Sequence, residues 1–347
     1  MKKFGKIAGV FAVILLLAAS PAFTQNNLDL GKVQSAMNSF SESIAKALPF
    51  NSTVGLNWSD AYIGQLIDAP PHFGLGMTVG VTSLNSAAIS SILDSFGAGG
   101  ININLPVLGF PLPAYTFEAR LGGFGIPFDL GFKFGTLDTS KMKMFDGLFP
   151  DDMSLDYLLI GGDFRYALID SKGFPVKLSI GLGFNHLRGG IKAKLGEGMT
   201  STFDDGIGNS ATLKIDAPIL GLTWKTNVIE AKVHISFPLV VITPYVGIGA
   251  SYSWSEAGYQ VKSKVKVSGT GPGGSDINKY TETLYEQYGI TGLTKNGFES
   301  VNKINGFNVR AFGGLSLNLW VIKLDLTVMF NIFDQALGAT VGLRFQL

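Results

Sequence analysis

The sequence predicts an all-β protein, a transmembrane antiparallel up-and-down β-barrel with a short N-terminal amphipathic helix. Three observations predict this fold class. Apolar and polar residues alternate along many segments, charged residues make up only 15% of the chain against 46% hydrophobic residues, and no segment after the N-terminal leader is apolar for long enough to form a membrane helix. A soluble domain usually has about 25% charged residues. Within hydrocarbon every backbone amide and carbonyl must be bonded inside the protein, so a closed barrel is the sheet that can span a membrane.

Alternation with a period of two is clearest in the segments 72–84, 127–135, 176–185 and 229–237. In each segment apolar side chains fall on one face, and glycine, small polar residues or paired charges fall on the other. Such alternation is typical of strands with one apolar and one polar face. A soluble β-sandwich produces the same alternation, but a polar face rich in glycine, serine, threonine and paired charges favours the inside of a membrane barrel.

Residues 1–22 have the features of a cleaved signal peptide. Three lysines precede an apolar run over 7–19, and the small residues Ser20-Pro21-Ala22 provide a cleavage site. The apolar run is shorter than the roughly 20 residues that span a bilayer as a helix. The sequence therefore predicts that the chain is exported and that this segment is removed.

The charge balance and the lack of cysteine exclude several classes of function. Removing residues 1–22 takes away three of the 27 basic residues and none of the 26 acidic ones, which leaves 24 against 26 and a formal charge of −2. This balance argues against nucleic acid as a partner. The chain contains no cysteine, which excludes disulfide bonds, thiol chemistry and a lipid anchor on an N-terminal cysteine.

The end of the sequence carries a recognisable pattern. Residues Thr340, Gly342, Phe345 and Leu347 resemble the closing-strand signal of bacterial outer-membrane β-barrel proteins, the porin-like superfamily. That signal has a polar residue, a glycine two positions later and two hydrophobic residues at the end; many members have Phe or Trp where this chain has Leu347. The resemblance implies insertion by the barrel-assembly machinery, contact with outer-membrane lipid, and a location in the outer membrane of a double-membraned bacterium.

We predict about twelve strands, an even number as in bacterial single-chain barrels, with ten or fourteen as alternatives. The predicted strands are 53–59, 72–84, 113–122, 125–135, 155–168, 174–187, 211–224, 228–238, 241–255, 306–318, 319–331 and 336–347. Tight turns are predicted at 122–124, 171–173 and 225–227. The predicted divisions are a signal peptide (1–22), an N-terminal helical segment (23–50) and the barrel (51–347), with long loops near 85–112, 136–154, 188–210 and 256–305.

Residues 28–48 have the pattern of an amphipathic helix. Apolar residues recur there at steps of three and four, namely Leu30, Val33, Met37, Phe40, Ile44 and Leu48. Because this segment precedes the first strand, we predict that it begins on the periplasmic side. One interpretation is a plug or gate that reaches into the lumen, and the other is a helix lying on the periplasmic rim or the membrane surface. A second short helix is predicted over 87–96.

Charged residues on the polar faces are the candidates for lining the lumen. They are Glu118, Arg120, Asp129, Lys133, Asp163, Arg165, Glu230, Lys232, His234, Arg310, Lys323, Asp325 and Arg344. Five opposite-sign pairs stand two positions apart and so project from one strand face. They predict either a charged constriction that selects solutes or a self-neutralising network that fills a narrow barrel, since buried charges need partners. The near-equal signs favour the network. Arg310 and Arg344 lack an acid on the same strand and are predicted to pair across strands or to line the path.

The leading hypothesis for function is a porin-like channel for the passive passage of small solutes. The alternatives are a structural or adhesin-like barrel with a filled lumen that acts through its outer loops, and a transporter of hydrophobic ligands with a plug and an apolar pocket. Phe312 and the many glycines on the inner faces leave room for such a pocket. No catalytic, metal or cofactor site is predicted. The three histidines, His72, His186 and His234, are scattered, and none is placed beside a serine as a nucleophile and base require.

Overall fold

The computed structural model describes residues 30–63, 72–84, 110–123, 126–139, 153–170, 176–194, 199–204, 210–217, 219–262, 265–269 and 298–347. The predicted signal peptide and the helix predicted over 87–96 lie outside them. Within these ranges the elements are α2 (Leu30–Asn51), β1 (His72–Leu84), β2 (Phe110–Gly122), β3 (Phe128–Asp138), β4 (Met153–Ile169), β5 (Lys177–Lys194), β6 (Met199–Asp204), β7 (Ser210–Ile215), β8 (Ile219–Ser236), β9 (Ile242–Lys262), β10 (Val265–Gly269), β11 (Phe298–Leu319), β12 (Ile322–Asn331) and β13 (Ala336–Gln346). No helix among the described residues is long and apolar enough to cross a membrane.

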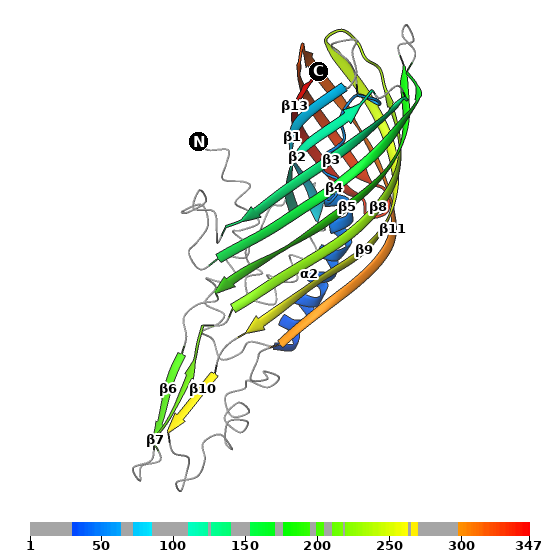
Figure 1. The fold of residues 1–347 in the computed structure, drawn as a ribbon. Helices are drawn as coiled ribbons and strands as arrows, with labels where there is room; N and C mark the ends of the chain where they lie inside the picture. The colour runs from blue at the N-terminus through cyan, green and yellow to red at the C-terminus, as the bar shows by residue number, and fades with distance from the viewer. Residues whose placement is uncertain are drawn as a thin grey trace.

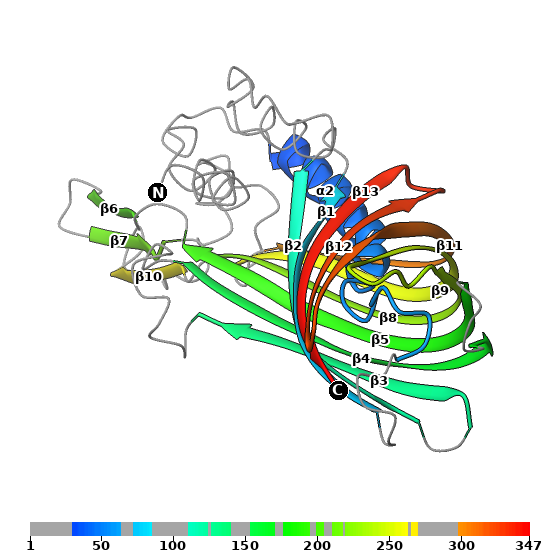
Figure 2. The same cartoon turned by 90° about the horizontal axis from the view of Figure 1, so that it is seen from above.

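Ten of the described strands close into one antiparallel barrel (Figures 1 and 2). Barrel strands that follow one another in the chain are paired in the sheet, once β6, β7 and β10 are set aside, and β1 pairs with β13 to close the ring. Strands β6, β7 and β10 form a separate three-stranded sheet. The predicted closed up-and-down barrel with an N-terminal helix is therefore confirmed, and the predicted number of about twelve strands is wrong.

Two errors account for the difference in strand number. Residues 53–59 are not a strand: they lie inside the barrel, and both Gly55 and Leu56 have positive φ. The predicted strands 211–224 and 228–238 are largely one strand, β8, and the turn predicted at 225–227 lies in its middle. The polar run Lys225-Thr226-Asn227 looked like a turn, but Thr226 is buried and its hydroxyl lies 2.8 Å from that of Ser255 on β9.

With β8 continuous, the long connections fall at one end of the barrel. The chain segments after β1, β3, β5 and β9 are long, and those after β2, β4, β8 and β11 are short. In bacterial outer-membrane barrels long loops lie outside the cell and short turns in the periplasm. We therefore call the end with the long connections the outer end, and the other end the inner end. The loops predicted near 85–112, 136–154, 188–210 and 256–305 were too long, since 110–112, 136–138, 188–194, 256–262 and 298–305 belong to barrel strands.

Outward side chains form an apolar band around the barrel. On β9 the outward positions from Pro244 to Trp254 extend about 33 Å along the strand at about 3.3 Å per residue. A strand tilted by about 40° then crosses about 25 Å, the height of the lipid-facing band in outer-membrane barrels. Val246 and Ile248 in this band are about half exposed, whereas the inward Tyr245 is buried. The band therefore has the composition and height of a lipid-facing surface.

A charge in the middle of this band is expected to destabilise the barrel. Leu326 lies midway along β12 and is exposed on the outward face, so Leu326→Arg should lower the free energy of unfolding by about 2–4 kcal/mol. The matched control is Leu319→Arg at the inner-end turn, which should cost about 0–1 kcal/mol. Urea unfolding of the folded protein in lipid vesicles measures both values. Equal losses at the two depths would contradict a lipid-facing band.

The barrel wall is much taller on one side. Strands β9 and β11 have 21 and 22 residues, whereas β12 and β13 have 10 and 11. The outer parts of β4, β5, β8, β9 and β11 therefore extend beyond the rest of the barrel (Figure 1). We call this extension the projecting wall.

Helix α2 begins at the outer end and runs into the barrel along the inner face of the projecting wall. Tyr259 near the end of β9 donates a hydrogen bond to the carbonyl of Gln34, and Asn302 on β11 donates one to the carbonyl of Asn38. The predicted start on the periplasmic side is wrong. The apolar stripe of the helix finds a dry surface at the outer end, where Met37, Ile44 and Leu48 share one core with residues such as Ile191, Leu222 and Tyr259. The side chains of residues 30–33 lie outside the described part.

Candidate functional site

The lumen is the candidate functional site, and it is occupied by the chain's own N-terminal segment. After α2 ends at Asn51, residues 52–63 continue through the barrel to the inner end, and every residue from 47 to 63 is buried. We call residues 30–63 the plug. Its irregular part turns at Gly55, where a Cβ atom would lie 2.4 Å from the Thr116 hydroxyl, so the close approach to β2 needs glycine.

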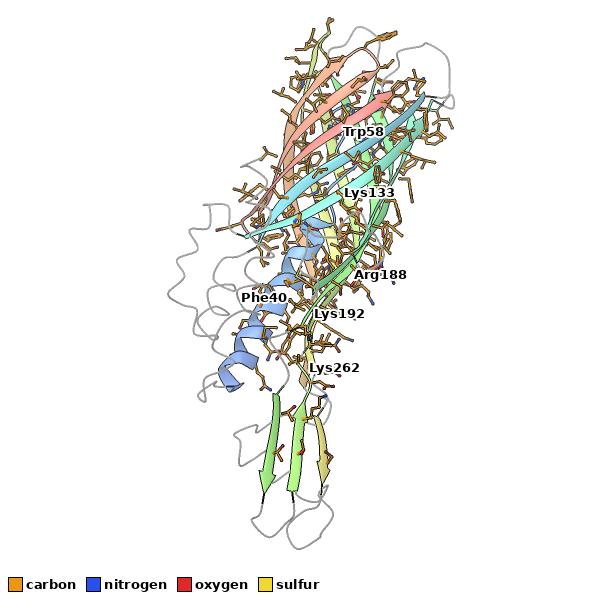
Figure 3. The ribbon with its side chains drawn as sticks, turned by 90° about the vertical axis from the view of Figure 1, so that its left-hand side faces the viewer. Phe40, Trp58, Lys133, Arg188, Lys192 and Lys262 are labelled. Atoms are coloured by element: carbon orange, nitrogen blue, oxygen red, sulfur yellow. The ribbon has the colours of Figure 1, made fainter. Side chains whose placement is uncertain are left out.

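Charged side chains of β2 and β3 bind the upper part of this irregular segment. Glu118 accepts hydrogen bonds from the amide of Leu56 at 3.0 Å and from the indole nitrogen of Trp58 at 2.5 Å. The Lys133 ammonium donates to the carbonyls of Ser52 and Val54 at 2.7 and 2.8 Å. Buried backbone groups need partners, and here wall charges supply what secondary structure would otherwise provide. Trp58 and Lys133 are labelled inside the barrel in Figure 3.

The lower part of the plug is bound in the same way. Asp129 accepts from the amide of Ile63 at 2.9 Å, Ser236 accepts from the amide of Ala61 at 3.0 Å, and Arg165 donates to the carbonyl of Asp60 at 2.6 Å. These contacts come from three different strands. They hold the segment against the part of the wall that β3, β4, β5 and β8 form.

The Asp60 carboxylate ties the plug to the last two strands. One of its oxygens lies 2.9 Å from the Lys323 ammonium and 2.7 Å from the Arg344 guanidinium. The Trp58 ring lies between two guanidinium groups, with its centroid 5.4 Å from Arg120 and 4.9 Å from Arg344. Cations over an indole face are attracted by its negative charge density. The plug therefore takes part in the charge network as well as filling space.

The remaining charges of the wall pair with one another across strands. Arg120 bonds Asp129 and also lies 2.8 Å from Asp163. Asp163 lies 2.7 Å from Lys232, and Arg165 lies 2.7 Å from Asp129. These five side chains, three basic and two acidic, form one connected group, which we call the Asp129 network.

Two further ion pairs extend the same arrangement. Arg310 lies 2.5 Å from Glu230, and Arg344 lies 2.6 Å from Asp325. Thus Arg310 and Arg344 pair across strands, which was one of the two predicted possibilities for them.

The same-strand pairs predicted from the sequence do not form. No ion pair within the described residues joins Glu118 with Arg120, Asp129 with Lys133, Asp163 with Arg165, Glu230 with Lys232, or Lys323 with Asp325. The reason is geometric. Residues two apart on a strand are separated by about 6.6 Å, whereas Asp129 and Arg165 are directly opposite on neighbouring strands, where Cβ atoms lie about 4.5–5.5 Å apart. The other ion pairs between lumen-facing wall residues join diagonal neighbours or reach past a glycine on an intervening strand.

Glycines between the charges make the cross-strand contacts possible. Gly131 stands in register between Arg120 on β2 and Asp163 on β4, and a Cβ atom there would lie 2.2 Å from the Asp163 carboxylate. A Cβ atom at Gly249 would lie 2.5 Å from the carboxylate of Glu230. At these two positions the inner-face glycines give long side chains room to reach past an intervening strand.

The thirteen predicted lumen residues all face the interior, and most are buried. The exception is Lys323, which keeps 14% of its side-chain surface exposed. His234 does not join the charges: its ring packs against Tyr245 and Phe312, with centroids 5.4 and 5.7 Å away. Sequence reasoning missed Asn57, Trp58 and Asp60. Residues 51–60 contain many side chains that can form hydrogen bonds, which could have indicated a segment bound to the barrel wall. The strand predicted over 53–59 hid this signal.

The other predicted residues have structural positions. Thr340 is buried, Phe345 and Leu347 are partly exposed on the outward face, and Leu347 exchanges backbone hydrogen bonds with Phe73 at the closing seam. Gly342 faces inward opposite Thr78 and Asp325. The three histidines lie in separate places, and no group of three or more histidine, cysteine or acidic side chains in the described ranges is arranged to hold a metal ion.

A model of the Lsa36-like protein family matches residues 73–347. The chain belongs to the Lsa36-like family. The match covers the barrel of this Lsa36-like protein and begins after the plug. The sequence has no significant match among curated proteins.

Several solved structures are similar to this chain over most of their length. They include the attachment invasion locus protein Ail of Yersinia pestis (8% identity, TM-score 0.27, 80% of this chain and 97% of that one), a major outer membrane protein from Thermus thermophilus (11%, 0.30, 80% and 100%) and the toluene transporter TbuX of Ralstonia pickettii (10%, 0.26, 81% and 90%). At these scores the likenesses carry no inference about the function of this Lsa36-like chain.

Proposed function

We propose that this protein is an outer-membrane β-barrel closed by its own N-terminal segment, a structural or adhesin-like barrel that acts through its outer end. The observation that carries the proposal is the filled lumen. Residues 47–63 are all buried, and their backbone groups are bonded to Glu118, Asp129, Lys133 and Arg165. A permanently open pore would leave these charges to water.

The proposed location in the outer membrane is supported by the shape of the barrel. The outward apolar band has about the height of a bilayer core, and a closed ring leaves no strand edge to lipid. The pattern of Thr340, Gly342, Phe345 and Leu347 supports insertion by the barrel-assembly machinery after export. Outer-membrane lipid is then the immediate partner of the band.

The part proposed to act outside the cell is the projecting wall with the connections at the outer end. Five strands continue beyond the band on one side only, so they present a surface that a minimal membrane barrel does not need. Strands of about 9–11 residues suffice to span a membrane, and β9 and β11 have about twice that length. This surplus supports contacts outside the membrane.

Conductance of the full mature chain tests the closed lumen. Refolded protein in a planar lipid bilayer is expected to give no steady channel current at either polarity. Heat-modifiable migration in the same preparation checks that the barrel has folded. A stable open channel from the unaltered chain would replace this proposal by the porin-like function.

A porin-like passage for small solutes is the second candidate, and it requires the plug to move. The observation favouring it is the connectivity of the plug. Its helical end lies at the outer mouth and is held by an apolar core, while only its other end continues into β1.

A transporter of hydrophobic ligands is a further candidate. The outer mouth of the lumen is apolar and the deeper lumen is polar, so a hydrophobic ligand would fit only in the space that α2 now fills. We propose no catalytic step, because His72, His186 and His234 lie apart.

A further inference from the structure

The outward face of the projecting wall changes character just beyond the apolar band. Tyr252 and Trp254 on β9 stand at the outer edge of the band, and Trp254 is in register with Asn227 of β8, which pairs with His186 of β5. Aromatic and amphipathic side chains are enriched where hydrocarbon meets headgroups. The next outward positions along these strands therefore face the headgroup layer.

Basic residues occupy those next positions. Arg188 on β5 lies opposite Lys225 on β8, and Lys225 lies opposite Glu256 on β9, which lies opposite Lys303 on β11. The Glu256 carboxylate lies 3.9 Å from the Lys225 ammonium and 3.7 Å from the Lys303 ammonium, so both ion pairs are long. Arg188 is exposed at the end of this row.

Farther out, the same face remains basic. Lys192 and Lys194 are exposed on β5, and Lys262 is exposed at the end of β9 (Figure 3). Lys194 is opposite Ile219, which is opposite Lys262, so these two lysines lie two strands apart in one row. Among the described outward positions beyond the row of Trp254 there are six basic side chains and four acidic ones. They are Arg188, Lys192, Lys194, Lys225, Lys262 and Lys303 against Asp138, Asp156, Glu256 and Glu299.

We propose that this face binds the phosphate groups of outer-leaflet lipids with extended, multiply phosphorylated headgroups. The inference rests on the outer-membrane placement proposed above. Arg188 stands two residues beyond the row of Trp254, or about 7 Å along the strand, and Lys192 stands six residues beyond it, or about 20 Å. At a strand tilt of about 40° these distances correspond to about 5 Å and 15 Å along the membrane normal. The headgroup layer of an ordinary bilayer is only about 5–8 Å deep on each side. A ligand that reaches both rows therefore needs a headgroup that extends well beyond the glycerol level.

Lipid is favoured over a soluble polyanion by the continuity of this face. The basic rows lie on the same strands and the same side as Ile229, Tyr252 and Phe307 of the apolar band. A lipid molecule whose chains lie against the band places its headgroup against Arg188 and the lysines beyond it. The opposite, inner face of the projecting wall is already covered by α2.

Lipid retention tests the proposal. Full-length mature protein is reconstituted in phosphatidylcholine vesicles with a small fraction of lipid A, either diphosphorylated or dephosphorylated, and is then extracted in mild detergent. The lipid A that stays with each barrel is measured by its hydroxy fatty acids. We expect the diphosphorylated form to be retained at least about fivefold more, the factor that one basic residue near an anionic surface supplies. The preference should fall with added salt.

Matched variants identify the residues involved. The triple variant R188Q/K192Q/K262Q should retain the two forms about equally. The control K46Q/K177Q/K214Q removes three basic charges from α2, the inner end and β7, and it should keep the preference. Equal retention of both forms by the unaltered, correctly inserted barrel would overturn the proposal. It would also be overturned if heparin, a soluble polyanion, bound the unaltered protein and not the triple variant while lipid A retention showed no preference. Failure to insert into vesicles would instead reject the membrane barrel itself.

Discussion

Removing residues 30–63 is expected to convert a barrel without steady current into a conducting channel. A barrel of eight strands is about the size that its own side chains fill, and this barrel has ten. The extra width holds the plug, so its removal leaves a path for water. The charges that lose plug partners, such as Glu118 and Lys133, become hydrated in that path, and the barrel is therefore expected to remain folded.

Two variants make this conductance experiment decisive. Replacing residues 30–63 by a glycine–serine linker of equal length keeps the tether to β1, and it should open the channel as the deletion does. The control E42A/K46A changes an ion pair on α2 whose two side chains are about half exposed, and it should stay closed. A folded deletion variant that carries no current would mean that wall side chains, rather than the plug, close the lumen.

Asp129→Ala is expected to lower the free energy of unfolding by about 3–5 kcal/mol, because it leaves buried charges without a partner. Asp129 is fully buried and bonds Arg120, Arg165 and the amide of Ile63. Arg120 keeps Asp163 after the substitution, but Arg165 loses the carboxylate that it contacts. Urea unfolding of the refolded protein, followed by far-UV circular dichroism, measures the loss.

The control for this substitution is an ion pair near the inner end. Asp170 pairs with Lys177, and both side chains are about a quarter exposed. Asp170→Ala should therefore cost less than about 1 kcal/mol, as surface ion pairs do. If Asp129→Ala were as mild as Asp170→Ala, the Asp129 network would not be a source of stability.

The fold class followed from the sequence because alternation is a local signal. Each strand shows its two faces in its own residues, as Leu326 and Thr327 do on neighbouring positions of β12, one outward and one buried. The set of residues facing the lumen was predictable for the same reason. Strand ends were harder to predict, because Lys225-Thr226-Asn227 has the polarity of a turn and only the register with β5 and β9 makes it strand.

The ion pairing and the plug depend on contacts between distant segments. Nothing near Asp60 in the sequence indicates that Lys323 and Arg344 will surround its carboxylate. The outer start of α2 was also hidden, because position before the first strand suggested the periplasm. An apolar helix stripe needs a dry surface, and only the packed structure places that surface at the outer mouth.

The course of the plug determines how the protein responds to mechanical load. The plug continues in the chain into β1, and β1 forms the closing seam with β13, with Gly74 opposite Gln346 near the inner end. A pull on the helix at the outer end is transmitted down the lumen and arrives at the inner end of β1. After the plug has detached from the wall, that force separates β1 from its neighbours one backbone hydrogen bond at a time. A pull along the strand axis would instead load all the backbone hydrogen bonds between the strands at once. A force applied at the outer mouth therefore acts on the seam between β1 and β13 in the direction in which its hydrogen bonds break most easily.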